Sequence, residues 1–169
     1  MQQVLILIGI SGSGKSTWAG QFVQANPTYL RLNRDDLRRS LLAVPLSQYW
    51  TWETAAKNRI ERLVTILFDT AFGAALAHGW DLVLDNTHLN RTYLTELLRV
   101  VKAYSTPARP VTVTYRLVDT PLQTAIDRDR PRPDGVGEAV IREQHRRLQS
   151  LKKQVDLGQK IVYPLPTIG

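Results

Sequence analysis

The stretch QVLILIGISGSGKST, residues 3–17, joins a continuous apolar run to a glycine-rich turn. Apolar residues that follow one another without alternation are typical of a strand buried on both faces of a parallel sheet. The turn, Gly9 to Thr17, fits the pattern G-x-x-x-x-G-K-S/T, in which backbone N–H groups surround phosphate oxygens. With a strand before it and a helix after it, the pattern predicts a P-loop rather than an accidental glycine-rich turn.

Each part of this loop has an expected task in binding ATP or another NTP. Lys15 supplies a positive charge to the β and γ phosphates, and the Ser16 hydroxyl can ligate Mg²⁺. The helix that follows adds its positive N-terminal end. The expected nucleotide site consists of Gly9, Ser11, Gly12, Ser13, Gly14, Lys15, Ser16 and Thr17.

Outside the loop, apolar strands alternate with amphipathic helices, which predicts an α/β fold with a mainly parallel central sheet flanked by helices. A helix over 51–78 is expected from the spacing of its apolar residues, with Thr51 as its cap. The alternating stretch 111–119 predicts a strand with one wetter face, at a sheet edge. Further strands are predicted at 3–9, 28–33, 80–86 and 160–165, and further helices at 14–25, 35–43, 91–104, from 121, and at 138–156. The stripe expected to face inward on the 51–78 helix is Ala56, Ile60, Leu63, Leu67, Ala71 and Ala75.

Asp85 ends the predicted strand 80–86, where a Walker-B acid orients Mg²⁺, directly or through water. Ligands of such sheets bind beyond the carboxyl ends of the strands, so Thr87 is expected there as well. The alternative is a turn in which Asp85 or Asn86 caps the next helix. Next to a P-loop, the functional interpretation is favoured.

Asp35 and Arg38 follow the second predicted strand, with the i, i+3 spacing that places both on one helix face. The carboxylate could accept a hydroxyl proton during phosphoryl transfer, and the guanidinium could hold a phosphate of the acceptor. A capped, salt-bridged helix start explains these residues equally well, and it suits Asp36 and Arg39 better.

The segments GISGSGKSTWA, LNRDDLRRS and LDNTHLN occur here in one order with VDTP (118–121) and EAVIREQHRRLQSLKK. Together they resemble the kinase domain of the polynucleotide 5′-kinases of phage and cellular end-healing enzymes. The resemblance extends through nearly the whole chain. It implies a P-loop kinase fold whose active-site tunnel admits a single-stranded 5′ end of DNA or RNA, with ATP and Mg²⁺ as the other reactants.

The resemblance also implies roles for individual residues. Asp35 would be the general base on the 5′-hydroxyl, and Arg38 would hold the phosphate on the 3′ side of the acceptor nucleotide. The proline- and glycine-rich segment 128–137 would be a loop that forms the lid over the NTP phosphates. Arg132 best matches the lid arginine that stabilises the transferring phosphoryl group, with Arg128 as the second candidate.

The composition narrows the class of protein. A length of 169 residues predicts a single domain, 1–169, without a phosphatase or ligase domain. The net charge of +7 favours an anionic partner, and the absence of cysteine excludes disulfides and Cys-based metal sites. No membrane segment or signal peptide is visible, so a cytosolic location is expected.

Two other functions fit the same motifs. A small-molecule P-loop kinase for a nucleoside, sugar or nucleotide-sugar would share the loop, the lid and the acid after the second strand. An NTP-dependent binding or switch module would use the loop without an acceptor. Two further features are weaker evidence for nucleic-acid binding. They are the aromatic pair Trp50 and Trp52, and the basic residues Arg142, Arg146, Arg147, Lys152 and Lys153.

Overall fold

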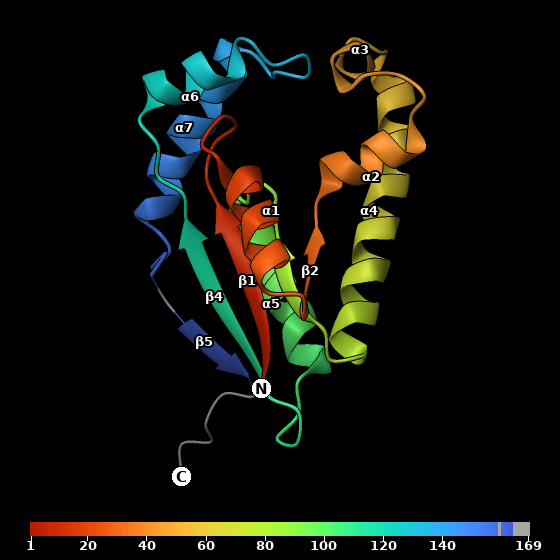
Figure 1. The fold of residues 1–169 in the computed structure, drawn as a ribbon, viewed down its shortest axis with the longest axis vertical. Helices are drawn as coiled ribbons and strands as arrows, with labels where there is room; N and C mark the ends of the chain where they lie inside the picture. The colour runs from red at the N-terminus through yellow and green to blue at the C-terminus, as the bar shows by residue number, and fades with distance from the viewer. Residues whose placement is uncertain (159, 164–169) are drawn as a thin grey trace.

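The fold is described from a computed structural model of the chain, over residues 1–158 and 160–163. Its strands are β1 Gln2–Ile8, β2 Tyr29–Leu32, β3 Asp81–Leu84, β4 Val111–Leu117 and β5 Lys160–Tyr163. They form one sheet in the order β2-β3-β1-β4-β5, in which β5 runs antiparallel to β4 and all other neighbours are parallel (Figure 1). The predicted α/β fold with a mainly parallel sheet is therefore confirmed.

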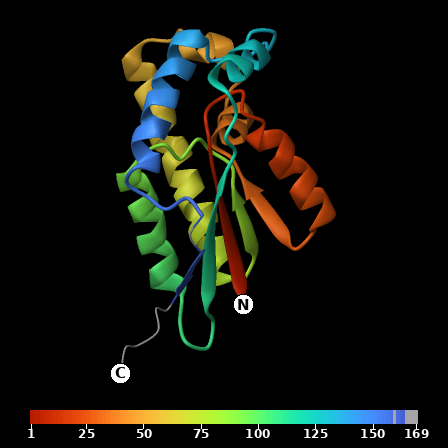
Figure 2. The ribbon, with the colours of Figure 1, turned by 90° about the vertical axis from the view of Figure 1, so that its left-hand side faces the viewer.

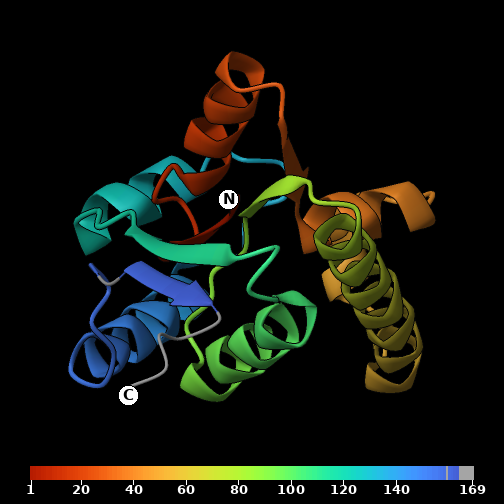
Figure 3. The ribbon, with the colours of Figure 1, turned by 90° about the horizontal axis from the view of Figure 1, so that it is seen from below.

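The helices are α1 Lys15–Ala25, α2 Arg34–Leu41, α3 Leu46–Trp50, α4 Thr54–Ala77, α5 Arg91–Tyr104, α6 Leu122–Asp129 and α7 Glu138–Lys152. Figure 3 shows α1 on one side of the sheet and α5 and α7 on the other. The alternation of β1 explains both layers, because Leu7 packs with the α1 side and Ile6 and Ile8 join the larger core. That larger core takes Phe68 and Phe72 from α4, Leu94 and Leu97 from α5, and Ile141 and Leu148 from α7.

The parallel strands end at one edge of the sheet, which is the upper end in Figures 1 and 2. There β1 leads into the glycine-rich loop and β2 leads into α2. The helix pair α6–α7 flanks this edge on one side and α2–α3 flanks it on the other (Figure 1). The edge is where the sequence places its candidate site residues.

The long helix α4 is shorter than the predicted helix 51–78, and it turns a different face toward the core. It begins at Thr54, because α3 precedes it as a separate short helix, and Thr51 is the C-cap of α3 instead of the cap of α4. Val64, Phe68 and Phe72 form its buried stripe, and Ala75 of the predicted stripe is buried too, whereas Leu63 of that stripe is 41% exposed. The helix has two apolar stripes, and burial of the phenylalanines removes the larger apolar surface from water.

Two other predictions also need correction. Strand β4 is not at a sheet edge, because it pairs with β1 on one side and β5 on the other, and Thr112 on its predicted wetter face is fully buried. The loop expected at 128–137 starts later, since α6 continues through Asp129. The last predicted strand is present as Lys160–Tyr163, and the remainder of that prediction, 164–165, lies outside the described residues.

Within residues 1–158 and 160–163, every helix is too short or too polar to cross a membrane.

Candidate active site

A cleft of about 970 Å³ lies at the carboxyl edge of the sheet. It brings together most of the site residues predicted from the sequence: Ser11, Gly12, Gly14, Lys15, Ser16, Thr17, Asp35, Arg38, Asp85, Thr87, Arg128 and Arg132. Gly9 and Ser13 do not line the cleft. Ser13 is buried, and the Gly9 N–H donates to the Thr87 carbonyl at 3.2 Å. These two residues therefore support the loop from beneath.

The glycine-rich loop needs glycine at two positions for backbone reasons. Gly12 and Gly14 have φ angles of +75° and +96°, in the left-handed region that favours glycine. A Cβ at Gly12 would also lie 2.2 Å from the Ala125 carbonyl oxygen, so α6 presses against the loop. Gly14 is the N-cap of α1, which directs the N-terminal end of that helix into the cleft.

Lys15 is buried beneath the loop, and its ammonium nitrogen donates to the Ile10 carbonyl at 2.7 Å and to Ser13 Oγ at 3.3 Å. Burial lowers the pKa of this ammonium to about 8, with Arg132 acting in the same direction and Asp85 and Asp35 opposing it. The ammonium is thus positive at neutral pH but only modestly stabilised. A bound polyphosphate would restore the missing countercharge.

The lowered pKa of Lys15 predicts that the affinity for a nucleotide depends on pH. Above about pH 8 the free protein loses the Lys15 proton, whereas phosphates would keep it in the complex, so binding takes up a proton. Affinity for Mg·ATP should be constant just below pH 8 and fall by up to about tenfold per pH unit above it. Calorimetric titrations across this range measure the profile.

The Lys15→Arg variant is the control for that profile, because a guanidinium stays protonated throughout. Its affinity should be weaker and independent of pH. An equally steep fall in the variant would show that Lys15 is not the group that titrates.

Asp35 and Arg38 contact each other at the mouth of the cleft. Asn33 caps α2 by accepting from the Asp36 N–H, which fixes the helix start directly after β2. One turn later Arg38 Nη1 donates to Asp35 Oδ1 at 2.6 Å. The Asp35 side chain is 49% exposed whereas that of Arg38 is 11% exposed. The pair therefore presents a solvent-accessible carboxylate held by a largely buried guanidinium.

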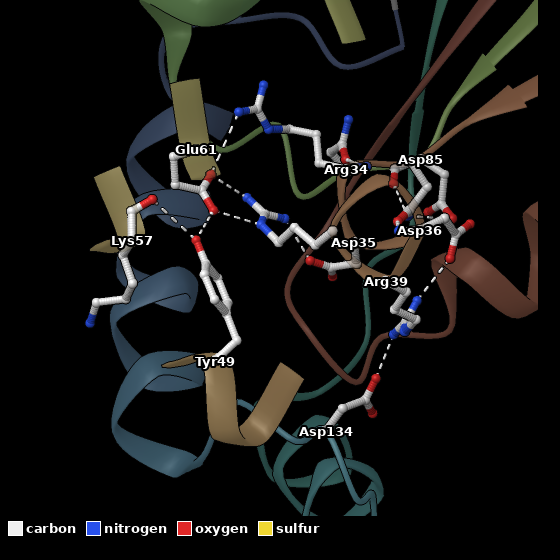
Figure 4. Close-up of polar contacts among 12 residues, drawn as sticks. Arg34, Asp35, Asp36, Arg39, Tyr49, Lys57, Glu61, Asp85 and Asp134 are labelled. Atoms are coloured by element: carbon white, nitrogen blue, oxygen red, sulfur yellow. Dashed lines mark hydrogen bonds and ion pairs between the residues drawn. The ribbon is translucent and has the colours of Figure 1, made fainter. Parts of the chain in front are cut away.

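Glu61 of α4 completes this arrangement and was not predicted from the sequence. Its carboxylate accepts from Arg38 Nε and Nη2 at 2.7 and 2.6 Å, and Tyr49 Oη donates to the same carboxylate at 2.7 Å (Figure 4). Burial opposes ionisation, but these hydrogen bonds hold the pKa of Glu61 below its ordinary value. Trp50 lies on the other side, with its ring centre 5.2 Å from the Arg38 guanidinium. Arg38 is thus fixed from three directions.

If Arg38 binds an acceptor and the loop binds a nucleotide, the Glu61→Gln variant should weaken the use of the acceptor and leave that of the nucleotide unchanged. The amide cannot accept two hydrogen bonds in the way a carboxylate does, so Arg38 loses its orientation while Lys15 and the loop stay intact. We expect roughly a tenfold rise in the acceptor KM, about 1.4 kcal/mol of binding, with the ATP KM unchanged. Steady-state kinetics of transfer measure both constants.

The matched control is Glu96→Gln, whose exposed carboxylate pairs with Arg99 on α5 at 2.8 Å, outside the cleft. It should leave both KM values unchanged. A Glu61→Gln protein that uses its acceptor normally would show that Arg38 needs no such support.

Asp85 is fully buried at the end of β3 and is held by neighbours from β2 and α2. Arg31 Nε and Nη2 donate to its Oδ2 at 2.8 and 2.6 Å, and Asn33 Nδ2 donates to the same oxygen at 3.1 Å and also to the Asp85 carbonyl. The other oxygen, Oδ1, is buried without a hydrogen-bond partner in the described part of the chain. It is available to accept from a water on Mg²⁺.

The few oxygen ligands in the cleft suit Mg²⁺, which also binds water and phosphate, better than a metal ion held by protein side chains alone. Residues 1–158 and 160–163 contain no group of three or more His, Cys, Asp or Glu side chains that could hold a metal ion. Mg²⁺ commonly keeps waters and binds through few protein oxygens together with substrate phosphates. Ser16, in the cleft, and the free Asp85 oxygen fit such a site.

The lid candidates lie above the loop, on α6 and on the segment that joins it to α7. Arg128 Nη1 lies 4.0 Å from the position of a Cβ on Gly14, and both residues line the cleft. Arg132 lines it too, with Asp134 at 3.3 Å. Asp134 also contacts Arg39 of α2 at 2.5 Å (Figure 4). The segment between α6 and α7 is therefore connected with α2 across the cleft. Arg130 lies outside the cleft lining and contacts Asp127 at 3.6 Å.

Most of the basic residues on α7 are paired with acids. Arg142 contacts Glu138 at 2.7 Å, and Arg146 and Arg147 both contact Glu143. Lys152 reaches Asp119 at 2.7 Å. This helix face is a network of ion pairs more than an uncompensated basic patch, so the cleft itself is the better place for an anionic ligand.

The chain is similar in sequence and in fold to known proteins. A family model described as an AAA domain matches residues 4–151. A viral protein named as a bifunctional polynucleotide kinase/RNA ligase, from Autographa californica nuclear polyhedrosis virus, is 27% identical over 168 residues. The match covers 94% of this chain but 23% of the viral protein, so the chain spans less than a quarter of that relative.

Two solved structures share the fold. A chain in the structure titled as the Pnkp1/Rnl/Hen1 RNA repair complex superposes with a TM-score of 0.75 at 23% identity, over 99% of this chain and 50% of its own length. A gluconokinase from Sinorhizobium meliloti 1021 superposes with a TM-score of 0.51 at 16% identity, over 86% of this chain and 74% of its own. At these identities the likeness shows the fold, and function must be argued from the cleft.

Proposed function

Because the chain belongs to the AAA domain family of P-loop proteins, we propose that it transfers the γ-phosphoryl group of ATP to the 5′-hydroxyl end of DNA or RNA. The observation that carries the proposal is the Asp35–Arg38 pair at the mouth of the cleft that also holds Lys15. A carboxylate and a guanidinium 2.6 Å apart offer a base for a hydroxyl and a donor for a phosphate. The names of the viral relative and of the RNA repair complex support a polynucleotide acceptor.

In the proposed reaction the side chains divide the work between base, clamp and charge neutralisation. Asp35 accepts the proton of the 5′-hydroxyl as its oxygen attacks the γ-phosphorus in line with the leaving β–γ bridging oxygen. Arg38 holds the phosphate on the 3′ side of the acceptor nucleotide, and Glu61 keeps its guanidinium in place. The bond to ADP breaks as the new P–O bond forms.

Charge on the transferring group is neutralised from several directions. Lys15 contacts the β and γ phosphates from below, and Arg128 and Arg132 approach from the lid side of the cleft. Mg²⁺, held by Ser16 and through water by Asp85, would supply further positive charge on the phosphate oxygens. Such electrostatic stabilisation is the main protein contribution to phosphoryl transfer.

A competition between acceptors tests this proposal against a small-molecule kinase. The protein would be incubated with γ-labelled ATP, Mg²⁺, and equal concentrations of a 5′-hydroxyl oligonucleotide, a nucleoside and gluconate. The proposal expects label on the oligonucleotide, with an acceptor affinity that falls as salt rises. Label on the nucleoside or the sugar acid, and none on the oligonucleotide, would refute it.

A further inference from the structure

Gln144 of α7 lies where the cleft meets a second cavity of about 920 Å³. The two share the lining residues Arg34, Asn86, Thr87, Val140 and Gln144. Gln144 thus sits on the helix that follows the lid, next to the glycine-rich loop. It lies within the segment EAVIREQHRRLQSLKK, but the sequence assigned it no role.

The orientation of the Gln144 amide follows from its partner on the loop. The backbone N–H of Ser11, 133 positions away, donates to Gln144 Oε1 at 2.7 Å. A backbone N–H can only donate, so the oxygen faces Ser11 and the NH₂ group points elsewhere. That NH₂ group has no hydrogen-bond partner among the described residues. Its nitrogen is also not one of the fully buried polar atoms that lack a partner in this part of the chain. It remains an open donor.

The position of Ser11 identifies the phosphate closest to this donor. The amides at the start of α1 lie at the opposite end of the loop, and the backbone N–H groups of such loops surround the α and β phosphates. Lys15, which serves the β and γ phosphates in such loops, rests with its ammonium on the carbonyl of Ile10, directly before Ser11. The outermost phosphate therefore belongs near Ile10 and Ser11, on the side where Gln144 lies.

We propose that Gln144 binds the γ-phosphoryl group through its amide NH₂, while its oxygen anchors the side chain on the Ser11 N–H. The inference rests on the proposed function, since it requires a nucleoside triphosphate on the loop. It makes Gln144 a substrate-binding residue that distinguishes ATP from ADP. Because α7 continues from the lid, this contact also ties the lid helix to the group being transferred.

The Gln144→Glu variant separates this role from a structural one. The carboxylate still accepts from the Ser11 N–H, but it presents a negative oxygen in place of the NH₂ donor. Calorimetric titrations with Mg·ATP and Mg·ADP would be made on the wild-type protein, Gln144→Glu and Gln144→Ala. The control is Gln149→Glu on the same helix, an exposed residue whose side chain forms a hydrogen bond with His145 and lines neither cavity.

A hydrogen bond to a charged group is worth enough to change affinity by about tenfold or more. We therefore expect Gln144→Glu to weaken ATP binding at least about tenfold, and more than Gln144→Ala does, with ADP binding unchanged within about twofold. Gln149→Glu should bind both nucleotides like the wild type. Thermal unfolding of each variant shows whether the fold is retained.

Wild-type ATP affinity in Gln144→Glu would overturn the proposal and leave Gln144 as a structural support of Ser11. An equal loss of ATP and ADP affinity would overturn it too, since that result indicates a distorted loop. The ratio of the two affinities needs no acceptor. A protein that transfers nothing to oligonucleotides but shows the predicted ratio would refute the proposed acceptor and retain the role of Gln144.

Discussion

Replacing Asp35 with asparagine should reduce phosphoryl transfer by about 10²–10⁴-fold and leave ATP binding unchanged, because a positioned general base contributes about that much to the rate. Asparagine keeps the shape of the side chain, and its carbonyl can still accept from Arg38 Nη1. It cannot take the hydroxyl proton. The measurement is the single-turnover rate of transfer at saturating ATP, together with a calorimetric affinity for ATP.

Asp36→Asn is the matched control for this substitution. Asp36 is the next residue along α2, but it contacts Arg31 and Arg39 at 2.5 and 2.8 Å and does not line the cleft. Its side chain is 47% exposed, so its ion pairs contribute little and the fold should be retained. If both variants lost transfer equally, Asp35 would not be the base.

Lys15→Ala should reduce transfer by about 10²–10³-fold or more, since it removes the charge that follows the phosphoryl group during the reaction. The effect differs from that of Asp35→Asn because ATP binding should weaken as well. Loss of the charge by itself should not lower stability. The pKa of about 8 shows that the folded protein disfavours the charged ammonium, so loss of that charge does not remove a stabilising contribution.

Lys102→Ala provides the comparison for Lys15→Ala, because Lys102 is an exposed lysine near the end of α5, outside both cavities. It should behave like the wild type in transfer, ATP affinity and melting temperature. Retained transfer in Lys15→Ala would contradict the assignment of the loop as the phosphate site.

The loop residues that line the cleft could be predicted from the sequence because they are close together in the chain. Gly9 to Thr17 is one continuous segment, and its glycines are required by backbone angles that few other residues adopt. The predicted strands at 3–9 and 80–86 end where β1 and β3 end, within two residues. Residues at strand ends therefore came to the same edge, as parallel pairing requires.

The contact between Glu61 and Arg38 could not be predicted from the sequence, because the two residues are far apart in the chain. Glu61 lies 23 positions from Arg38, on a helix whose two apolar stripes left its orientation undecided. The apolar spacing favoured a face through Leu63, and the structure buries Phe68 and Phe72 instead. Only that rotation turns Glu61 toward α2. Gln144 was missed for the same reason, since its partner lies 133 positions away.

The strand 111–119 was wrongly predicted to lie at a sheet edge. Alternation of polar and apolar residues indicates which face of a strand is more polar, but not where the strand lies in the sheet. Thr112 and Thr114 suggested a wetter face, yet Thr112 is fully buried, and β5 pairs with β4 along the edge that was expected to be free. Threonine is tolerated there because it is β-branched and its hydroxyl finds a partner, in this case Met1 Sδ at 2.8 Å.

The central claim is that this cleft phosphorylates a polynucleotide 5′-hydroxyl. Its most direct test uses two oligonucleotides that differ only at the 5′ end, one with a hydroxyl and one with a phosphate, incubated with γ-labelled ATP, Mg²⁺ and the wild-type protein. A polynucleotide 5′-kinase should place label on the 5′-hydroxyl strand alone, in DNA or in RNA. Absence of label from both DNA and RNA 5′-hydroxyl strands, with ATP binding intact, would contradict it.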